Sequence, residues 1–213
     1  MVELSGRWAG KPREERASER RDMLIAAGIE LFGSDGYRNT GVRAVCRRAC
    51  LTERYFYESF SNSEELLLAC FKRVVHGVRA QVVSADQPGR HSDERARSML
   101  RAYFGTLAAN PVAARVFLVE VVGVNPTIDR AFVESLITLS SLMFDVFDVE
   151  RIGAVARNPL LHRAVAGGLL HIALAWGDTG YEQPIGEVVE AALILSRLAV
   201  PSAADKISDL HPL

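Results

Sequence analysis

The segment "GVRAVCRRACLTERYFYESF", residues 41–60, decides how this chain is organised. Its first half is small and basic, and its second half carries four aromatic residues among polar neighbours. This pattern predicts two short helices joined by a tight turn, following a longer amphipathic helix over residues 18–34. Phe56 and Phe60 are spaced to pack on that first helix, which leaves one polar and aromatic face of the second short helix free.

The rest of the chain has helical hydrophobic spacing. Asn-Pro pairs begin at positions 110, 125 and 158, and each predicts a helix start, because asparagine is a good N-cap and proline at the first helical position has no N–H to leave unpaired. We therefore expect an all-α chain of about nine helices and no convincing strand. The expected helices are 18–34, 40–49 with Thr40 as cap, 52–60, 63–82, 92–109, 111–123, 126–149, 159–176 and 184–199.

Composition and charge narrow the class of protein. No apolar run approaches the roughly 18 residues that span a bilayer, and the start has no apolar signal core. Three cysteines form no disulfide framework, so we expect a cytoplasmic protein without membrane contact. The net charge is -1, yet the first 60 residues hold 11 of the 25 Lys and Arg and only 9 of the 26 Asp and Glu. This imbalance favours a polyanionic partner for the N-terminal part.

Residues 26–70, "AAGIELFGSDGYRNTGVRAVCRRACLTERYFYESFSNSEELLLAC", resemble the DNA-binding domain of TetR-family transcriptional repressors. The resemblance rests on many weak matches in order, among them Gly36-Tyr37, Thr40, Phe56-Tyr57 and Phe60. It implies a homodimer, a palindromic double-stranded operator and a small hydrophobic effector bound in a C-terminal helical domain. The expected parts are a basic arm (1–17), a helix-turn-helix domain (18–62), a helical dimerisation and effector domain (63–200) and a tail (201–213).

The second short helix suits the DNA major groove, which admits one α-helix. The sequence departs from the family pattern at the turn, where Cys50 replaces a common glycine, and at Glu53, Arg54 and Ser59. The operator sequence therefore cannot be taken from relatives. The alternative for the tyrosines is that they only pack. The candidate DNA-binding residues are Thr40, Arg43, Thr52, Glu53, Arg54, Tyr55, Tyr57, Ser59 and Ser61.

The C-terminal part is rich in large aromatic side chains that line an effector pocket or fill a core. Glu120 lies in the apolar run "VFLVEVVGV", where a bare carboxylate is costly unless it is paired. It either lines the pocket, bridges to Arg115 or His171, or points to solvent. The candidate pocket residues are Leu100, Tyr103, Phe104, Phe117, Glu120, Phe144, Phe147 and His171.

The last two helices are apolar over most of their circumference, so each needs two buried sides. A two-fold four-helix interface supplies the second side. The candidate dimer residues are Leu161, Ala164, Val165, Gly168, Ile172, Ala175, Val188, Ala192, Leu195 and Ala199.

No phosphate loop, nucleophile elbow or metal-ligand spacing is visible, so we expect no enzyme, cofactor or metal site. The preferred interpretation is a repressor released by a small apolar effector. The alternatives are a ligand-independent regulator, an activator, a helical interaction protein without DNA binding, or a small-molecule-modifying enzyme on a helical scaffold.

Overall fold

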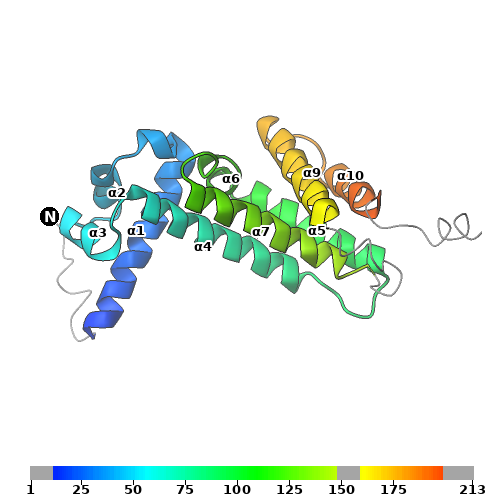
Figure 1. The fold of residues 1–213 in the computed structure, drawn as a ribbon, viewed down its shortest axis with the longest axis horizontal. Coiled ribbons are helices and arrows are strands. Elements are labelled where there is room, and N and C mark those ends of the chain that lie inside the picture. The colour runs from blue at the N-terminus through cyan, green and yellow to red at the C-terminus, as the bar shows by residue number, and fades with distance from the viewer. Residues whose placement is uncertain (1–11, 148–158, 199–213) are drawn as a thin grey trace, which may run out of the picture. The chain divides into compact units, whose positions relative to one another are not determined.

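The computed structural model describes residues 12–147 and 159–198, and within these ranges the regular elements are all helical (Figure 1). The all-α prediction is therefore confirmed. The elements are α1 (Arg13–Asp35), the 3-10 helix η2 (Tyr37–Asn39), α2 (Val42–Arg48), α3 (Glu53–Ser59), α4 (Ser63–Ser84), α5 (Ser92–Ala109), α6 (Pro111–Arg115), the π-helical turn η3 (Val116–Glu120), α7 (Pro126–Phe144), α9 (Pro159–Asp178) and α10 (Ile185–Leu198).

Local capping chemistry sets several helix starts. Helices α6, α7 and α9 all begin at the proline of an Asn-Pro pair. The side-chain oxygen of Asn125 accepts hydrogen bonds from the backbone N–H groups of Thr127 at 3.0 Å and Ile128 at 2.9 Å. These bonds satisfy two of the N–H groups that a helix start leaves without partners.

Three helix bounds differ from the sequence prediction. α1 begins at Arg13, so the last residues of the predicted basic arm are helical. The predicted helix 111–123 is divided into α6 and the π-helical turn η3, which buries the three successive side chains Val116, Phe117 and Leu118. Three successive residues cover more than half of an α-helix's circumference, so one regular helical face cannot bury them all. The predicted helix 126–149 is too long: α7 ends at Phe144, residues 145–147 form a turn, and residues 148 and 149 lie outside the described residues.

The described chain divides into two compact units. One holds the residues through Val74 together with Val112–Val124, and the other holds Val75–Pro111 together with the chain from Asn125 onward. The first unit therefore contains the helix-turn-helix, the beginning of α4 and the segment that forms η3. Its core is dominated by fully buried large side chains, which are Leu24, Ile25, Phe32, Phe56, Phe60, Leu66, Leu67, Phe71 and Phe117.

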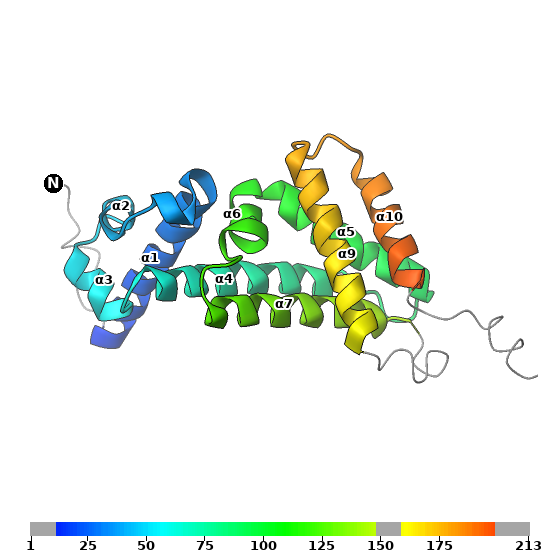
Figure 2. The ribbon, with the colours of Figure 1, turned by 45° about the horizontal axis from the view of Figure 1, so that its top comes forward.

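In the second unit, α5, α7, α9 and α10 pack on one another, with α9 and α10 side by side (Figure 2). By length and composition alone, α9 is apolar enough to cross a membrane. It nevertheless buries Val165, Ala173 and Trp176 within the unit, and the core helix of a soluble protein has the same composition. The indole N–H of Trp176 donates to the carbonyl of Gln183 at 3.0 Å, which ties the end of α9 to the turn before α10.

Candidate DNA-binding surface and effector cavity

The helix-turn-helix is held together by a small apolar core and one left-handed residue. Val45 from α2 and Phe56 from α3 are buried. Between the two helices, Cys50 has a φ of 54°, and the N–H of Leu51 donates to the carbonyl of Cys46 at 2.9 Å. The left-handed conformation expected where the family commonly has glycine is thus present at Cys50. A side chain in this conformation costs about 1–2 kcal/mol.

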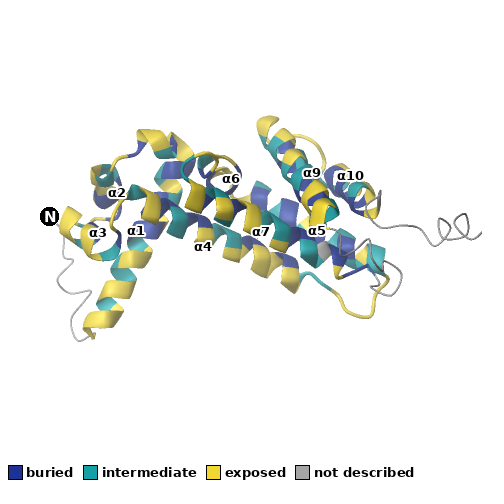
Figure 3. Ribbon diagram, in the orientation of Figure 1, coloured by how far each residue is buried: buried dark blue, intermediate teal, exposed yellow. Residues whose placement is uncertain are grey.

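The outward face of α3 is polar and exposed (Figure 3). Glu53, Arg54 and Tyr57 all lie on it, and 59% of Tyr57 is accessible to solvent. Such a large exposed aromatic residue is unusual unless it serves a contact, because its ring gains from burial and its hydroxyl gains from a hydrogen-bond partner. Arg43, in the first turn of α2, is exposed beside this face.

Acidic residues of α3 pair with the arginines of the same surface. Arg43 contacts Glu53 at 3.1 Å between Nε and Oε1, and Arg54 contacts Glu58 at 3.0 Å between the same atoms. Arg20 of α1 lies 3.7 Å from the other carboxylate oxygen of Glu58. Arg43 and Arg54, the two arginines predicted to contact DNA, are therefore both engaged in exposed ion pairs.

Two further details of this surface differ from the sequence prediction. Thr40 is buried, and its hydroxyl donates to the carbonyl of Gly36 at 2.8 Å. It ends η2 rather than capping α2, whose N-cap is Gly41, and it is not exposed for DNA contact. Tyr55 is half-buried, with the guanidinium of Arg20 over its ring at 4.5 Å from the centroid.

The remaining residues predicted to contact DNA differ in how exposed their side chains are. Thr52, at the N-cap position of α3, and Ser61, just after α3, are exposed, whereas Ser59 is half-buried. Sequence reasoning missed Glu58 and Arg20 as parts of this surface. The i,i+4 spacing of Arg54 and Glu58 predicts their ion pair from the sequence. The position of Arg20 beside Glu58 depends instead on how α1 and α3 pack.

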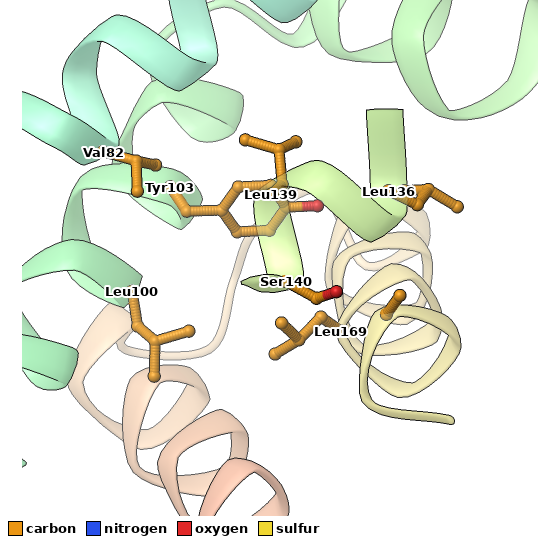
Figure 4. A pocket seen from close by; sticks show the side chains of 8 residues that line it. Val82, Leu100, Tyr103, Leu136, Leu139, Ser140 and Leu169 are labelled. Atoms are coloured by element: carbon orange, nitrogen blue, oxygen red, sulfur yellow. The ribbon is translucent and has the colours of Figure 1, made fainter. Parts of the chain in front are cut away.

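The second unit contains a narrow apolar cavity (Figure 4). Its free volume is about 20 Å³, which is room for roughly one water molecule. The Tyr103 ring reaches from α5 toward Leu139 and Ser140 on α7. Burial raises the pKa of the Tyr103 hydroxyl, which is one of the polar groups of the cavity. The lining residues are Val82, Leu100, Tyr103, Leu136, Leu139, Ser140, Ala166 and Leu169.

Of the eight predicted pocket residues, only Leu100 and Tyr103 line this cavity. Four others are buried as packing side chains, and three of these contact rings outside the predicted set. Phe104 packs on Trp176, Phe117 on Phe71, and Phe144 stacks on His162. The four packing residues are Phe104, Phe117, Phe144 and Phe147.

The two polar residues of the predicted pocket lie elsewhere. Glu120 does not line the cavity. Its carboxylate contacts Arg115 at 2.9 Å and accepts a hydrogen bond from the backbone N–H of Tyr37 at 2.7 Å. His171 is exposed on α9. The bridge to Arg115, one of the three alternatives for Glu120, is thus the one that the structure contains.

The predicted dimer residues fall into two groups. Val165, Val188 and Ala192 are buried within the chain itself, and a side chain at Gly168 would overlap Leu195 of α10. The small residue at position 168 therefore serves packing within the protomer. Four other members remain at least partly accessible, namely Leu161, Ala164, Ile172 and Ala175, whereas Ala199 lies outside the described residues.

Residues 24–70 match the family described as "Bacterial regulatory proteins, tetR family". The chain is 31% identical over 93 residues to the HTH-type transcriptional activator FasR of Mycolicibacterium smegmatis. That alignment covers 44% of this chain and 41% of FasR, so the chain spans less than half the length of this curated relative.

Solved structures share the fold. A bacterial regulatory protein in the tetR family from Rhodococcus RHA1 aligns with a TM-score of 0.65 at 21% identity, over 86% of this chain and 98% of that one. FadR of Bacillus subtilis, solved in complex with stearoyl-CoA, aligns with a TM-score of 0.67 at 16% identity. The alignment covers 84% of this chain and 99% of FadR.

Proposed function

We propose that this chain is a DNA-binding transcription regulator of the TetR family, because residues 24–70 match that family. We further propose that it is a cytoplasmic repressor that a small apolar effector releases from a palindromic operator. The observation that carries the effector proposal is the cavity of the second unit. Its wall is almost entirely aliphatic, and the hydroxyls of Tyr103 and Ser140 are its polar groups. A ligand oxygen that pairs with the Tyr103 hydroxyl would gain about 0.5–1.5 kcal/mol.

The cavity favours a particular kind of effector. An apolar chain matches the leucine, valine and alanine side chains of the wall, and a single oxygen on the chain would accept a hydrogen bond from Tyr103. Ser140 already donates to the carbonyl of Ile137 at 2.9 Å, so it offers the ligand a lone pair rather than a proton. A fatty acyl group fits this description, and FadR of Bacillus subtilis was solved with stearoyl-CoA.

The small free volume is part of the proposed mechanism. An acyl chain is far larger than one water molecule, so it binds only when the surrounding helices move apart. A ligand that binds one conformation better than another shifts the population toward it. The effector therefore selects a widened conformation of the second unit, and operator affinity falls by the difference in its affinity for the two conformations.

Thermal melting with fatty acids and acyl-CoA thioesters of increasing chain length tests the effector proposal. Long-chain compounds should raise the melting temperature and dissociate the chain from promoter DNA. In the Tyr103→Phe variant, both effects should require about tenfold higher concentrations of the compound. Tyr181→Phe is the matched control, because Tyr181 lies in the same unit outside the cavity and its ring contacts Trp176. If no compound of this class both stabilises the chain and releases DNA, it is a ligand-independent regulator.

An activator is the second candidate, because FasR is named as one. Transcription can be reconstituted from the promoter, RNA polymerase and this chain to distinguish a repressor from an activator. A repressor lowers the transcript yield, and an activator raises it. A chain that binds no DNA in a gel shift, with promoter and genomic fragments alike, would instead be a helical interaction protein.

We propose a homodimer formed by the outer faces of α9 and α10. Leu160 is 72% exposed on α9 and Ile194 is 56% exposed on α10, and Ala164 and Ala175 are also exposed on α9. Apolar side chains this accessible on two adjacent helices gain by burial against a second copy. The dimer would present two α3 helices to the two halves of a palindromic operator.

A further inference from the structure

The segment Val112–Val124 belongs to the same compact unit as α1, α2 and α3, although it follows them by more than 40 residues of sequence. Its contact with α1 is close. A side chain at Gly33 would overlap the backbone carbonyl of Val112. The ring of Phe117 lies 6.0 Å from that of Phe71 on α4. The unit that contains the helix-turn-helix is thus completed by residues outside the segment 24–70.

Two charged side chains of this segment bind the junction between α1 and η2. The Glu120 carboxylate accepts from the backbone N–H of Tyr37 at 2.7 Å and from Nε of Arg115 at 2.9 Å. Arg115 in turn donates from Nη1 to the carbonyl of Ser34 at 3.1 Å. The Glu120 side chain is only 10% exposed and its bond to the Tyr37 amide is partly buried, whereas the two bonds of Arg115 lie at the surface.

The two backbone groups concerned are ones that a helix end leaves without partners. Ser34 is in the last turn of α1, where carbonyl groups have no intrahelical donor, and Tyr37 begins η2, where N–H groups have no intrahelical acceptor. A guanidinium at the C-terminus of the long helix α1 is also favoured by the helix dipole. Arg115 and Glu120 therefore supply the missing partner on each side of Gly36, which has a φ of 92°.

This junction determines where the DNA-binding helices lie. From Gly36 the chain passes through η2 to Thr40 and directly into α2 and α3. A change in the backbone angles at Gly36 or Tyr37 would rotate α2 and α3 relative to α1. We propose that Glu120, assisted by Arg115, is a positioning residue for DNA binding, because its carboxylate holds the Tyr37 amide and so fixes the direction in which the helix-turn-helix leaves α1.

Operator titration of the full chain by fluorescence anisotropy tests this role with three variants. Glu120→Ala removes the acceptor of the Tyr37 amide, and operator affinity should fall about tenfold. Glu120→Gln keeps one carbonyl oxygen for that amide and should retain most of the affinity. Glu134→Ala is the control, because Glu134 is exposed on α7 in the other unit. The operator affinity of this variant should equal that of the unchanged chain.

Amide hydrogen exchange gives a readout that a general loss of stability would not produce. In Glu120→Ala the Tyr37 amide should exchange faster by about tenfold, while amides in the middle of α4 and α5 keep their rates. Binding of the acyl effector at the cavity should be retained, which shows that the second unit is intact.

Two results would overturn the proposal. One is a Glu120→Ala variant that binds operator within about twofold of the unchanged chain. The other is an affinity loss accompanied by equal acceleration of all amides, since this would indicate simple unfolding. If the unchanged chain itself bound no DNA, the proposed function would fail, and the exchange rate of the Tyr37 amide would still decide whether Glu120 holds the junction.

Discussion

Replacing Glu58 by glutamine should strengthen DNA binding. In the free protein Glu58 engages Arg54 at 3.0 Å, and the Arg54 side chain is 84% exposed. Before Arg54 binds a phosphate or a base, this ion pair has to open. An exposed i,i+4 pair contributes about 0.3–0.5 kcal/mol, so a dimer with two such pairs loses about 0.6–1 kcal/mol of binding free energy when it opens both.

The negative charge of Glu58 adds a second penalty. A carboxylate about 8 Å from a phosphate repels it by roughly 0.2 kcal/mol in water at physiological salt, where the screening length is also about 8 Å. Together the two effects amount to about 1–1.4 kcal/mol per dimer. Glu58→Gln should therefore bind DNA about five- to tenfold more tightly.

The assay is a fluorescence anisotropy titration with promoter DNA and with a shuffled duplex at several salt concentrations. The gain should be nearly equal on both duplexes, because phosphate contacts carry no sequence information, and it should shrink as salt rises. Glu94→Gln is the matched control, since Glu94 pairs with Arg90 at the same i,i+4 spacing in the other unit. Weaker binding of Glu58→Gln to the promoter alone would refute this reasoning and assign Glu58 to base recognition.

Three further predictions concern the fold and the assembly. Gly33→Ala should lower the free energy of unfolding by about 1–3 kcal/mol in chemical denaturation, because the added methyl group overlaps the backbone of Val112. Arg95 hydrogen-bonds Asp86 and lowers its pKa below the ordinary value of 3.8, so this pair stabilises the chain above about pH 4. The stabilisation should be lost as pH falls through the depressed pKa of Asp86. Between neutral and acidic pH, the melting temperature of Asp86→Asn should therefore fall less than that of the unchanged chain. Ile194→Arg should give a monomer in sedimentation with little change in melting temperature; a persisting dimer would place the interface elsewhere.

Much of the helix-turn-helix was predictable because its rules act over a few residues. Phe56 and Phe60 are buried as their spacing predicted. Cys50 has the left-handed conformation expected of a turn position that commonly holds glycine. Helix starts at the Asn-Pro pairs depend on one side-chain oxygen and one missing N–H, and both are visible in the letters of the sequence.

The lining of the cavity in the second unit was not predictable to the same extent. An aromatic residue that lines a cavity and one that fills a core have the same spacing on a helix, because both are apolar and both face inward. Tyr103 lines the cavity, whereas Phe117 and Phe144 pack against other rings. Their roles depend on the free space that neighbouring helices leave, and this is a property of the assembled core.

The sequence by itself thus determined the helical class, most helix starts and the family that residues 24–70 match, because periodicity, capping and turn conformation are local. Only the tertiary structure decided the partners of the charged groups. Glu120 binds an amide 83 residues earlier in the chain, and Arg20 reaches Tyr55 and Glu58 from a different helix. A carboxylate in an apolar run must find a partner, but which partner it finds depends on which distant segment the packing of apolar side chains brings beside it.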